Sequence, residues 1–168
     1  MILLKIGIVK MRVGFGYDIH KFRVSNEGHL RLGGVEIIEA QRLEGHSDGD
    51  SLIHAVIDAL LGAAGAGDIG ETFSPDDPSL KDIDSRELLL RVERLLQSRN
   101  LEVINLDVTI IAEKPRLSSY IKSMRESIAG VMNLPPTAVN IKATTNEGMG
   151  VIGNGEAIAA MAVALIQD

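Results

Sequence analysis

Residues 48–67 constrain the fold of this chain more than any other segment. Their apolar residues recur at the 3.6-residue spacing of an α-helix and so form one apolar face. That face consists of Leu52, Val56, Ala59, Leu60 and Ala63. Ser47 or Asp48 can cap the start of the helix, and the glycines at positions 65 and 67 can end it. We therefore predict an amphipathic helix that begins near Asp48.

Segments with the spacing of β-strands lie on both sides of this helix. Residues 12–16 alternate and then break at glycines, which predicts a short strand running into a loop. Residues 30–38 hold a Gly-Gly pair between two alternating stretches and predict a hairpin. Residues 106–110 alternate between apolar and polar side chains, as a half-buried strand does, and residues 139–144 predict another strand.

A long loop and two further helices complete the pattern. Residues 68–83 are rich in Gly, Pro and Asp and have no period, which predicts a loop. A helix is expected over residues 85–99, because Asp84 and Glu87 are spaced like a capping box before an apolar stripe. Another helix is expected from Ser118 or Ser119 to Met132, where two prolines follow.

The C-terminal segment, residues 156–167, fits two structures. Its alanine content favours a helix, whereas its nearly period-2 arrangement of larger apolar residues fits a strand buried on both faces. The pattern alone leaves both open. Because we find no internal repeat and no interdomain linker, we predict one mixed α and β domain over residues 11–168. Residues 1–10 are expected to be an N-terminal extension or an upstream start, with an integral strand as the open alternative.

Composition narrows the chemistry. Aromatic residues make up 3% of the 168 residues, so the core must be aliphatic. The absence of Cys excludes disulfides, thiolate zinc sites and Cys nucleophiles, which leaves 4 His and the carboxylates to hold a transition metal. The net charge of −6 argues against a broad surface for nucleic acid or an anionic membrane. With no signal peptide or membrane-spanning stretch recognised, we expect a cytoplasmic protein.

Asp18, His20 and His54 are the candidate metal ligands. Asp18 and His20 lie two residues apart, so in extended backbone both side chains project to the same side. His54 lies off the apolar face of the predicted helix, with Asp50 and Asp58 as candidates to orient its imidazole. Two His and one Asp would leave tetrahedral Zn²⁺ an open position, as in catalytic sites. On spacing alone, a surface loop and a solvated helix face remain alternatives.

Two other segments carry groups suited to phosphate. His46 and Ser47 precede the helix at its N-terminus, where free N–H groups favour anions. Residues 142–148, KATTNEG, end a strand with Thr144, Thr145 and Glu147. The hydroxyls could bind phosphate oxygens, and the carboxylate could hold a hard ion such as Mg²⁺. An ordinary capping segment and an ordinary turn remain the alternatives.

Four segments, taken together and in order, resemble a known family. They are RVGFGYDIH (12–20), HSDGDSLIHAVIDALLGAAGAGDIG (46–70), DVTIIAEKPRL (107–117) and IKATTNEGMG (141–150). They resemble the 2-C-methyl-D-erythritol 2,4-cyclodiphosphate synthases of the non-mevalonate isoprenoid pathway, and the resemblance runs from Met11 to the C-terminus. The second segment is the most specific of the four.

The resemblance implies a fold, an assembly and a reaction. The expected fold is an α+β two-layer sandwich with a roughly four-stranded mixed sheet and helices on one face. The C-terminal segment is then a strand, and three subunits form active sites between neighbours. The implied substrate is 4-diphosphocytidyl-2-C-methyl-D-erythritol 2-phosphate. Its 2-phosphate attacks the β-phosphorus, which forms the 2,4-cyclodiphosphate and releases CMP.

The resemblance also implies roles for individual positions. Asp18, His20 and His54 would bind Zn²⁺, and Glu147 would hold Mg²⁺ or Mn²⁺. His46 and Thr145 would stabilise the transition state. Residues 112–118 with Thr144 would form a cytidine pocket supplied by the adjacent subunit. The positions expected to bind substrate are Ser47, Asp68, Gly70, Phe73, Asp77, Ala112, Pro115, Arg116, Leu117, Ser118 and Thr144.

The sequence departs from the family pattern in places. Residues 73–78 read FSPDDP, Val151 replaces a usual Phe, and Asn154 replaces a frequent Arg near the trimer axis. We therefore expect altered ligand binding in the central cavity. Two other functions compete with the synthase: a metal- or nucleotide-binding trimer without turnover, and a zinc-dependent hydrolase of phosphoanhydrides.

Overall fold

The computed structural model describes residues 9–24 and 28–168. The predicted N-terminal extension, residues 1–10, therefore falls mostly outside the described residues. Among the residues that are described, no helix combines the length and the apolar character needed to cross a bilayer.

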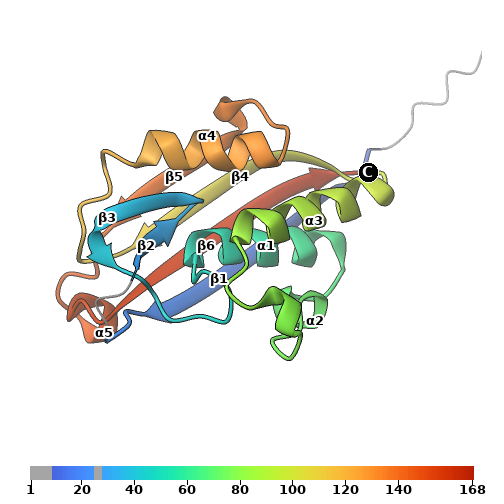
Figure 1. Cartoon of the computed structure of the whole chain (residues 1–168). Coiled ribbons are helices and arrows are strands. Elements are labelled where there is room, and N and C mark those ends of the chain that lie inside the picture. Colours follow the sequence, from blue (N-terminus) through green and yellow to red (C-terminus); the bar gives the residue numbers. More distant parts are fainter. Residues whose placement is uncertain (1–8, 25–27) are drawn as a thin grey trace, which may run out of the picture.

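A four-stranded sheet forms one layer of the domain, and helices form the other (Figure 1). The strands are β1 (Met11–Lys21), β4 (Glu102–Ile111), β5 (Val139–Thr144) and β6 (Ala157–Gln167). Their order is β1-β6-β4-β5, with β4 and β5 parallel and the other pairs antiparallel. The helices α1 (Ser51–Ala64), α3 (Ser85–Ser98) and α4 (Ile121–Val131) cover one face. The predicted α+β class with a mixed four-stranded sheet is confirmed.

Shorter elements surround these layers. The predicted hairpin is present as β2 (His29–Leu32) and β3 (Val35–Gln41). The expected loop 68–83 contains α2 (Ile69–Thr72) and the 3-10 turn η1 (Pro78–Leu80), so the prediction of a structureless loop is wrong. Carboxylates order both turns, because Asp68 accepts from the Glu71 N–H and Asp77 from the Ser79 N–H. Two further turns, η2 (Pro136–Ala138) and α5 (Gly150–Gly153), flank β5.

The N-cap of α1 differs from the one expected. Asp50, rather than Ser47 or Asp48, caps the helix by accepting from the Ile53 N–H at 3.1 Å. The same carboxylate accepts from the N–H groups of Gly33 and Gly34 at 2.9 and 2.7 Å. A buried carboxylate with three donors thus joins the β2–β3 turn to the start of α1.

The predicted end of α1 is confirmed, whereas the predicted start of α4 is wrong. Gly65 ends α1 in the left-handed conformation, as its position predicts. Helix α4 begins at Ile121 without a side-chain cap, so the expected start at Ser118 or Ser119 is wrong.

Strand β1 continues through the glycines that were expected to end it. A Cβ on Gly14 would lie 1.9 Å from the Ala59 carbonyl oxygen, and one on Gly16 would lie 2.0 Å from that of Ala55. The backbone of α1 therefore rests directly on β1. These glycines mark a close approach of helix and strand rather than a loop.

The C-terminal segment is strand β6, which decides the open alternative in favour of a strand. It lies between β1 and β4, so both of its edges are hydrogen-bonded. Ala160, Ala162 and Ala164 are fully buried, whereas Met161 and Val163 are 38% and 39% exposed. Small residues on the helix side let α1 approach this strand as well, and the larger apolar residues lie on the opposite face.

The core is aliphatic, as the composition predicts. The largest fully buried side chains are all leucine or isoleucine, and they come from the hairpin, the segment after it, the helices and β4: Leu30, Leu32, Ile37, Leu43, Leu52, Ile53, Ile57, Leu60, Leu61, Leu89, Leu96 and Leu106. Tight packing of such side chains makes the domain sensitive to added volume at the contact of α1 and β1.

The contact of α1 with β1 can be tested with two glycine-to-alanine variants. We expect Gly16→Ala to lower the free energy of unfolding by about 1–3 kcal/mol, because the new methyl group overlaps the α1 backbone. Gly62→Ala is the matched control, since no described residue packed against α1 comes within 4 Å of the methyl group that it would gain. Removing a helical glycine should stabilise the domain by about 0.5–1 kcal/mol. Urea unfolding followed by circular dichroism would measure both, and an unchanged stability in Gly16→Ala would contradict the packing.

Candidate metal centre and active site

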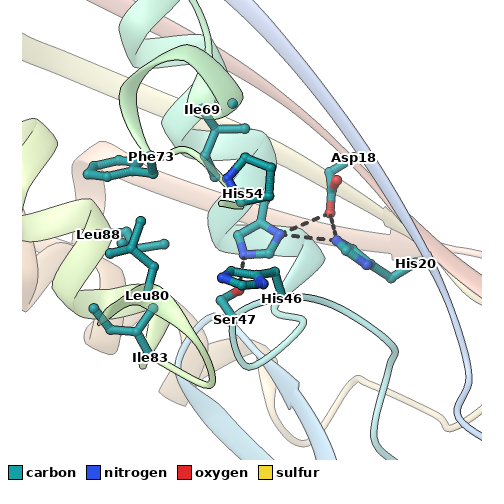
Figure 2. A pocket seen from close by; sticks show the side chains of 12 residues that line it. Asp18, His20, His46, Ser47, His54, Ile69, Phe73, Leu80, Ile83 and Leu88 are labelled. Atoms are coloured by element: carbon teal, nitrogen blue, oxygen red, sulfur yellow. Dashed lines mark hydrogen bonds and ion pairs between the residues drawn. The ribbon is translucent and has the colours of Figure 1, made fainter. Parts of the chain in front are cut away.

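Asp18, His20 and His54 converge on one point at the junction of β1 and α1 (Figure 2). The Asp18 Oδ2 atom lies 3.0 Å from His20 Nε2 and 3.3 Å from His54 Nδ1. The two nitrogens are 3.2 Å apart. His20 and His54, 34 positions apart in sequence, are thus brought together, and His54 is buried rather than on a solvated helix face.

The local fold explains this convergence. Side chains two residues apart on a strand share a face, so Asp18 and His20 project to the same side of β1 as Gly14 and Gly16. Because α1 rests on those glycines, the side chain of His54 lies directly beside the two β1 ligands. The metal candidates are therefore positioned by backbone packing rather than by flexible loops.

The donor set fits a cation. His20 Nδ1 contacts the Glu44 carbonyl oxygen, which can only accept, so this nitrogen carries the N–H and His20 Nε2 presents a lone pair to the centre. Two imidazole nitrogens and a carboxylate oxygen, all within 4.8 Å of one another, match the ligands that zinc takes in proteins. The two ring nitrogens would repel each other without a positive charge between them.

The pKa values of Asp18 and His20 also fit a site for a cation. Burial by itself would raise the pKa of Asp18, but hydrogen bonds and charge from His20 and His54 outweigh it and lower that pKa to about 2. Burial opposes charging of His20 as well, yet the Asp18 carboxylate raises the pKa of this imidazole. Asp18 is therefore an anionic ligand at neutral pH.

The imidazole of His54 is oriented by residues other than those expected. Asp50 is occupied as the N-cap of α1, and Asp58 accepts from the Ile69 N–H at 2.8 Å, so neither carboxylate holds His54. Instead, His54 Nε2 lies 3.0 Å from both the Ser47 and the Ser85 hydroxyl oxygens. Ser85 was missed because it lies 31 residues from His54, and no local pattern links them.

A pocket of about 240 Å³ opens beside the metal candidates (Figure 2). Four of the predicted site residues, namely His46, Ser47, Gly70 and Phe73, line it together with the metal candidates. Apolar side chains form its other wall: Ile69, Pro75, Leu80, Ile83 and Leu88. A polar end and an apolar wall suit a small ligand with both anionic and hydrocarbon parts.

His46 is an exposed residue of this pocket, whereas the predicted residues Asp68 and Asp77 lie outside its lining. The exposed imidazole of His46 has its Nε2 atom 3.3 Å from the Asp77 carbonyl oxygen. The side chains of Asp68 and Asp77 cap α2 and η1, and neither residue lines the pocket. They shape the segment that forms its rim.

A second pocket, of about 360 Å³, follows the ends of β4 and β5. Seven of the predicted site residues line it: Ala112, Pro115, Arg116, Leu117, Ser118, Thr144 and Thr145. It shares no lining residue with the first pocket. The residues implied by the resemblance are thus divided between two separate hollows of one chain.

The loop after β5 is held by Glu113, a residue that the sequence motifs did not single out. The Glu113 carboxylate accepts from the N–H groups of Asn146 and Gly148 at 2.8 and 3.2 Å. Glu147 adopts a positive φ of 52° and accepts from the Thr145 hydroxyl at 3.1 Å. Glu147 therefore lies with the second group of residues and not with the three metal candidates.

Comparisons with known proteins agree with the fold and the site. The sequence matches the YgbB family over residues 11–167. It is 50% identical over 158 residues to the 2-C-methyl-D-erythritol 2,4-cyclodiphosphate synthase of Halorhodospira halophila, covering 94% of this chain and 96% of that protein. It is 54% identical over 155 residues to the bifunctional enzyme IspD/IspF of Desulforudis audaxviator, covering 92% of this chain. The chain spans only 39% of the length of that bifunctional relative.

The fold is similarly matched by a solved structure. The IspF of Plasmodium falciparum, in its CDP complex, superimposes with a TM-score of 0.81 at 35% sequence identity. The match covers 93% of this chain and 95% of that chain. On the extent of the family match and the identity to full-length relatives, this chain belongs to the YgbB family.

Proposed function

We propose that this enzyme converts 4-diphosphocytidyl-2-C-methyl-D-erythritol 2-phosphate into 2-C-methyl-D-erythritol 2,4-cyclodiphosphate and CMP. The reaction is an intramolecular phosphoryl transfer that makes the enzyme a phosphorus–oxygen lyase. The observation that carries the proposal is the convergence of Asp18, His20 and His54 beside a pocket, in a chain whose relatives are named as this synthase. We place the reaction in the cytoplasm and assign the domain to residues 11–168.

Residues of the first pocket would hold the reacting end of the substrate. Asp18, His20 and His54 would bind Zn²⁺, which supplies positive charge to the β-phosphate when bound. An oxygen of the 2-phosphate forms a bond to the β-phosphorus while the bond from that phosphorus to the CMP oxygen breaks. The nucleophile is already anionic, so no general base is required, and tethering removes most of the entropic barrier.

The roles of the remaining residues follow from chemistry and position. His46 and Thr145 would donate hydrogen bonds to the phosphoryl oxygens as charge develops, and the Ser47 hydroxyl would contact phosphate. Asp68 and Gly70 would hold the erythritol part, and Phe73 and Asp77 would be further substrate contacts. Glu147 would hold Mg²⁺ or Mn²⁺ at the diphosphate, because hard cations prefer carboxylate oxygens.

A homotrimer with shared active sites is part of this proposal. The sheet face without helices exposes apolar side chains along β1, where Val13 and Phe15 are 67% and 62% exposed. Phe15 lies opposite Val163 and Tyr17 opposite Met161, so the apolar patch continues onto β6. A contiguous apolar face of this kind is typical of subunit interfaces. A second copy of the chain is the partner that we propose for it.

The division of the site residues between two pockets supports sharing of the active site. The pocket lined by Ala112, Arg116 and Thr144 would receive the cytidine part. The metal pocket of a neighbouring chain would then hold the diphosphate and the erythritol. In the complex of the Plasmodium falciparum relative, the ligand is CDP, which fits a cytidine-containing substrate.

The reaction itself is tested by phosphorus NMR. With Zn²⁺ and Mg²⁺, we expect the purified protein to release CMP and a cyclic diphosphate from the proposed substrate. A linear product with two separate phosphate monoesters would indicate the competing hydrolase. Binding of the nucleotide without turnover would indicate the competing binding protein, and either result would contradict the proposed reaction.

The zinc assignment is tested by His54→Ala. This variant should lose stoichiometric zinc, because one of three proposed protein ligands is gone, and should keep the oligomeric mass of the wild type. His29→Ala is the matched control, since His29 starts β2 and is not part of the metal group. Elemental analysis of the purified proteins gives the ratio of zinc to chain, and stoichiometric zinc in His54→Ala would contradict the assignment.

Sharing of the active site is tested by mixing two inactive variants. His54→Ala and Thr145→Ala should each lose about 100-fold or more in turnover. In co-assembled trimers with shared sites, about a quarter of the sites combine two intact halves, so activity should recover to about a quarter of the wild-type value. If each site lay within one chain, every site would carry one defect and mixing would restore nothing. Sedimentation should give a mass of three chains.

A further inference from the structure

The ring nitrogen of His54 that faces away from the metal centre is surrounded by hydroxyls. His54 Nδ1 faces Asp18 and His20, whereas Nε2 lies 3.0 Å from Ser85 Oγ and 3.0 Å from Ser47 Oγ. The His54 side chain is 8% exposed, and Ser85 is completely buried. Whether Nε2 carries a proton therefore depends on whether these two hydroxyl groups donate or accept there.

The Ser85 hydroxyl donates its one proton to Asp48. Ser85 Oγ lies 2.5 Å from Asp48 Oδ1 and donates to it. Both oxygens of Asp48 also accept backbone N–H groups, Oδ1 from Asp50 at 3.2 Å and Oδ2 from Ser85 at 3.1 Å. Since backbone amides only donate, both Asp48 oxygens act as acceptors in these contacts. A hydroxyl has one proton, so the Ser85 oxygen can only accept from His54.

This chain of hydrogen bonds selects one tautomer of His54. If Ser85 accepts, Nε2 carries a proton, and the neutral imidazole then offers the lone pair of Nδ1 to a cation held with Asp18 and His20. We propose that Ser85 and Asp48 are positioning residues that hold His54 in the tautomer and orientation needed to bind the metal. The proposal rests on the proposed metal role of Asp18, His20 and His54. Partners of this kind on a ligating imidazole commonly raise metal affinity 10–100-fold.

The two serines at equal distance from His54 differ in what their hydroxyls can do. With the proton on Nε2, Ser47 cannot donate to this nitrogen, so its own hydroxyl proton is free to point elsewhere. Ser47 lines the first pocket, whereas Ser85 does not. Ser85 thus acts on the imidazole, while the Ser47 hydroxyl stays available to a ligand in the pocket.

The positioning pair also links three parts of the fold. Asp48 belongs to the segment before α1, and Ser85 is the first residue of α3. The Arg42 guanidinium donates to the Ser47 carbonyl oxygen at 2.9 Å and to that of Asp48 at 3.4 Å, and it pairs with Asp82 at 2.7 Å. These contacts hold the segment in place, so that the Asp48 carboxylate lies at the start of α3.

The first test compares zinc binding by wild type, Ser85→Ala and Ser47→Ala in competition with a chromophoric chelator. Each variant removes one hydroxyl from the same nitrogen at the same distance. Ser85→Ala should bind zinc about 10-fold more weakly, because the pathway to Asp48 is lost. Ser47→Ala should weaken zinc binding less than Ser85→Ala does, because the Asp48 carboxylate acts through Ser85. Ser85→Thr should retain the affinity because it keeps a hydroxyl. Equal affinity in Ser85→Ala and wild type would overturn the proposal.

The second test reads the protonation of His54 Nε2 directly in the metal-free protein by nitrogen-15 NMR. The chain has only 4 His, which makes assignment of His54 practical. We expect Nε2 to carry a proton in the wild type, because Ser85 can only accept there. In Asp48→Asn the amide can donate to Ser85, which can then donate to His54, so the share of unprotonated Nε2 should increase. A wild-type spectrum in which Nε2 carries no proton would overturn the proposal, even if a variant failed to fold.

The two tests also separate this proposal from the proposed function. A wild type that binds no zinc would contradict the metal site itself. The proton on His54 Nε2 in the metal-free protein tests the hydrogen bond to Ser85 without any zinc. Zinc binding by the wild type together with equal affinities in the two alanine variants would contradict only the positioning role.

Discussion

The direct contact between the backbones of α1 and β1 is the constraint on which the rest of the structure depends. Gly14 and Gly16 leave no side chain between strand and helix, and Ala55 and Ala59 face them from α1. This contact closes the two layers at one edge of the sheet. It also places His54 beside Asp18 and His20, so the same packing builds the core and the metal centre.

The one-sided arrangement of helices has a second consequence. Residues of β1 alternate between the α1 contact and an open face, and on that face they are large and apolar. In a single chain these side chains stay exposed, and the two pockets remain separate. The proposed trimer accounts for both observations, because one association would cover the apolar face and bring together pockets from different chains.

Much of this structure could be predicted from sequence, and the failures share a physical cause. Period and spacing predicted a helix after Asp48, the hairpin and the grouping of Asp18 with His20, because these depend on neighbours in sequence. The expected polar face of that helix was wrong, since nearly all of α1 is buried. The glycines of β1 were wrongly expected to end the strand, since the reason for them lies on α1. The hydrogen bond of Ser85 with Asp48 was not predicted because it joins residues 37 positions apart. The C-terminal segment could be either helix or strand on sequence alone. Its alanines favour a helix, but in the structure they let α1 pack closely on the strand.

The most direct measurement of the proposed site is a zinc-edge anomalous diffraction map of the protein crystallised with zinc and CDP. We predict one zinc at about 2.0–2.2 Å from Asp18 Oδ2, His20 Nε2 and His54 Nδ1. We further predict that the cytidine occupies the pocket at Arg116 and Thr144 of one chain while the diphosphate reaches the zinc of its neighbour. Zinc bound elsewhere, or a nucleotide contained within a single chain, would contradict the shared metal site.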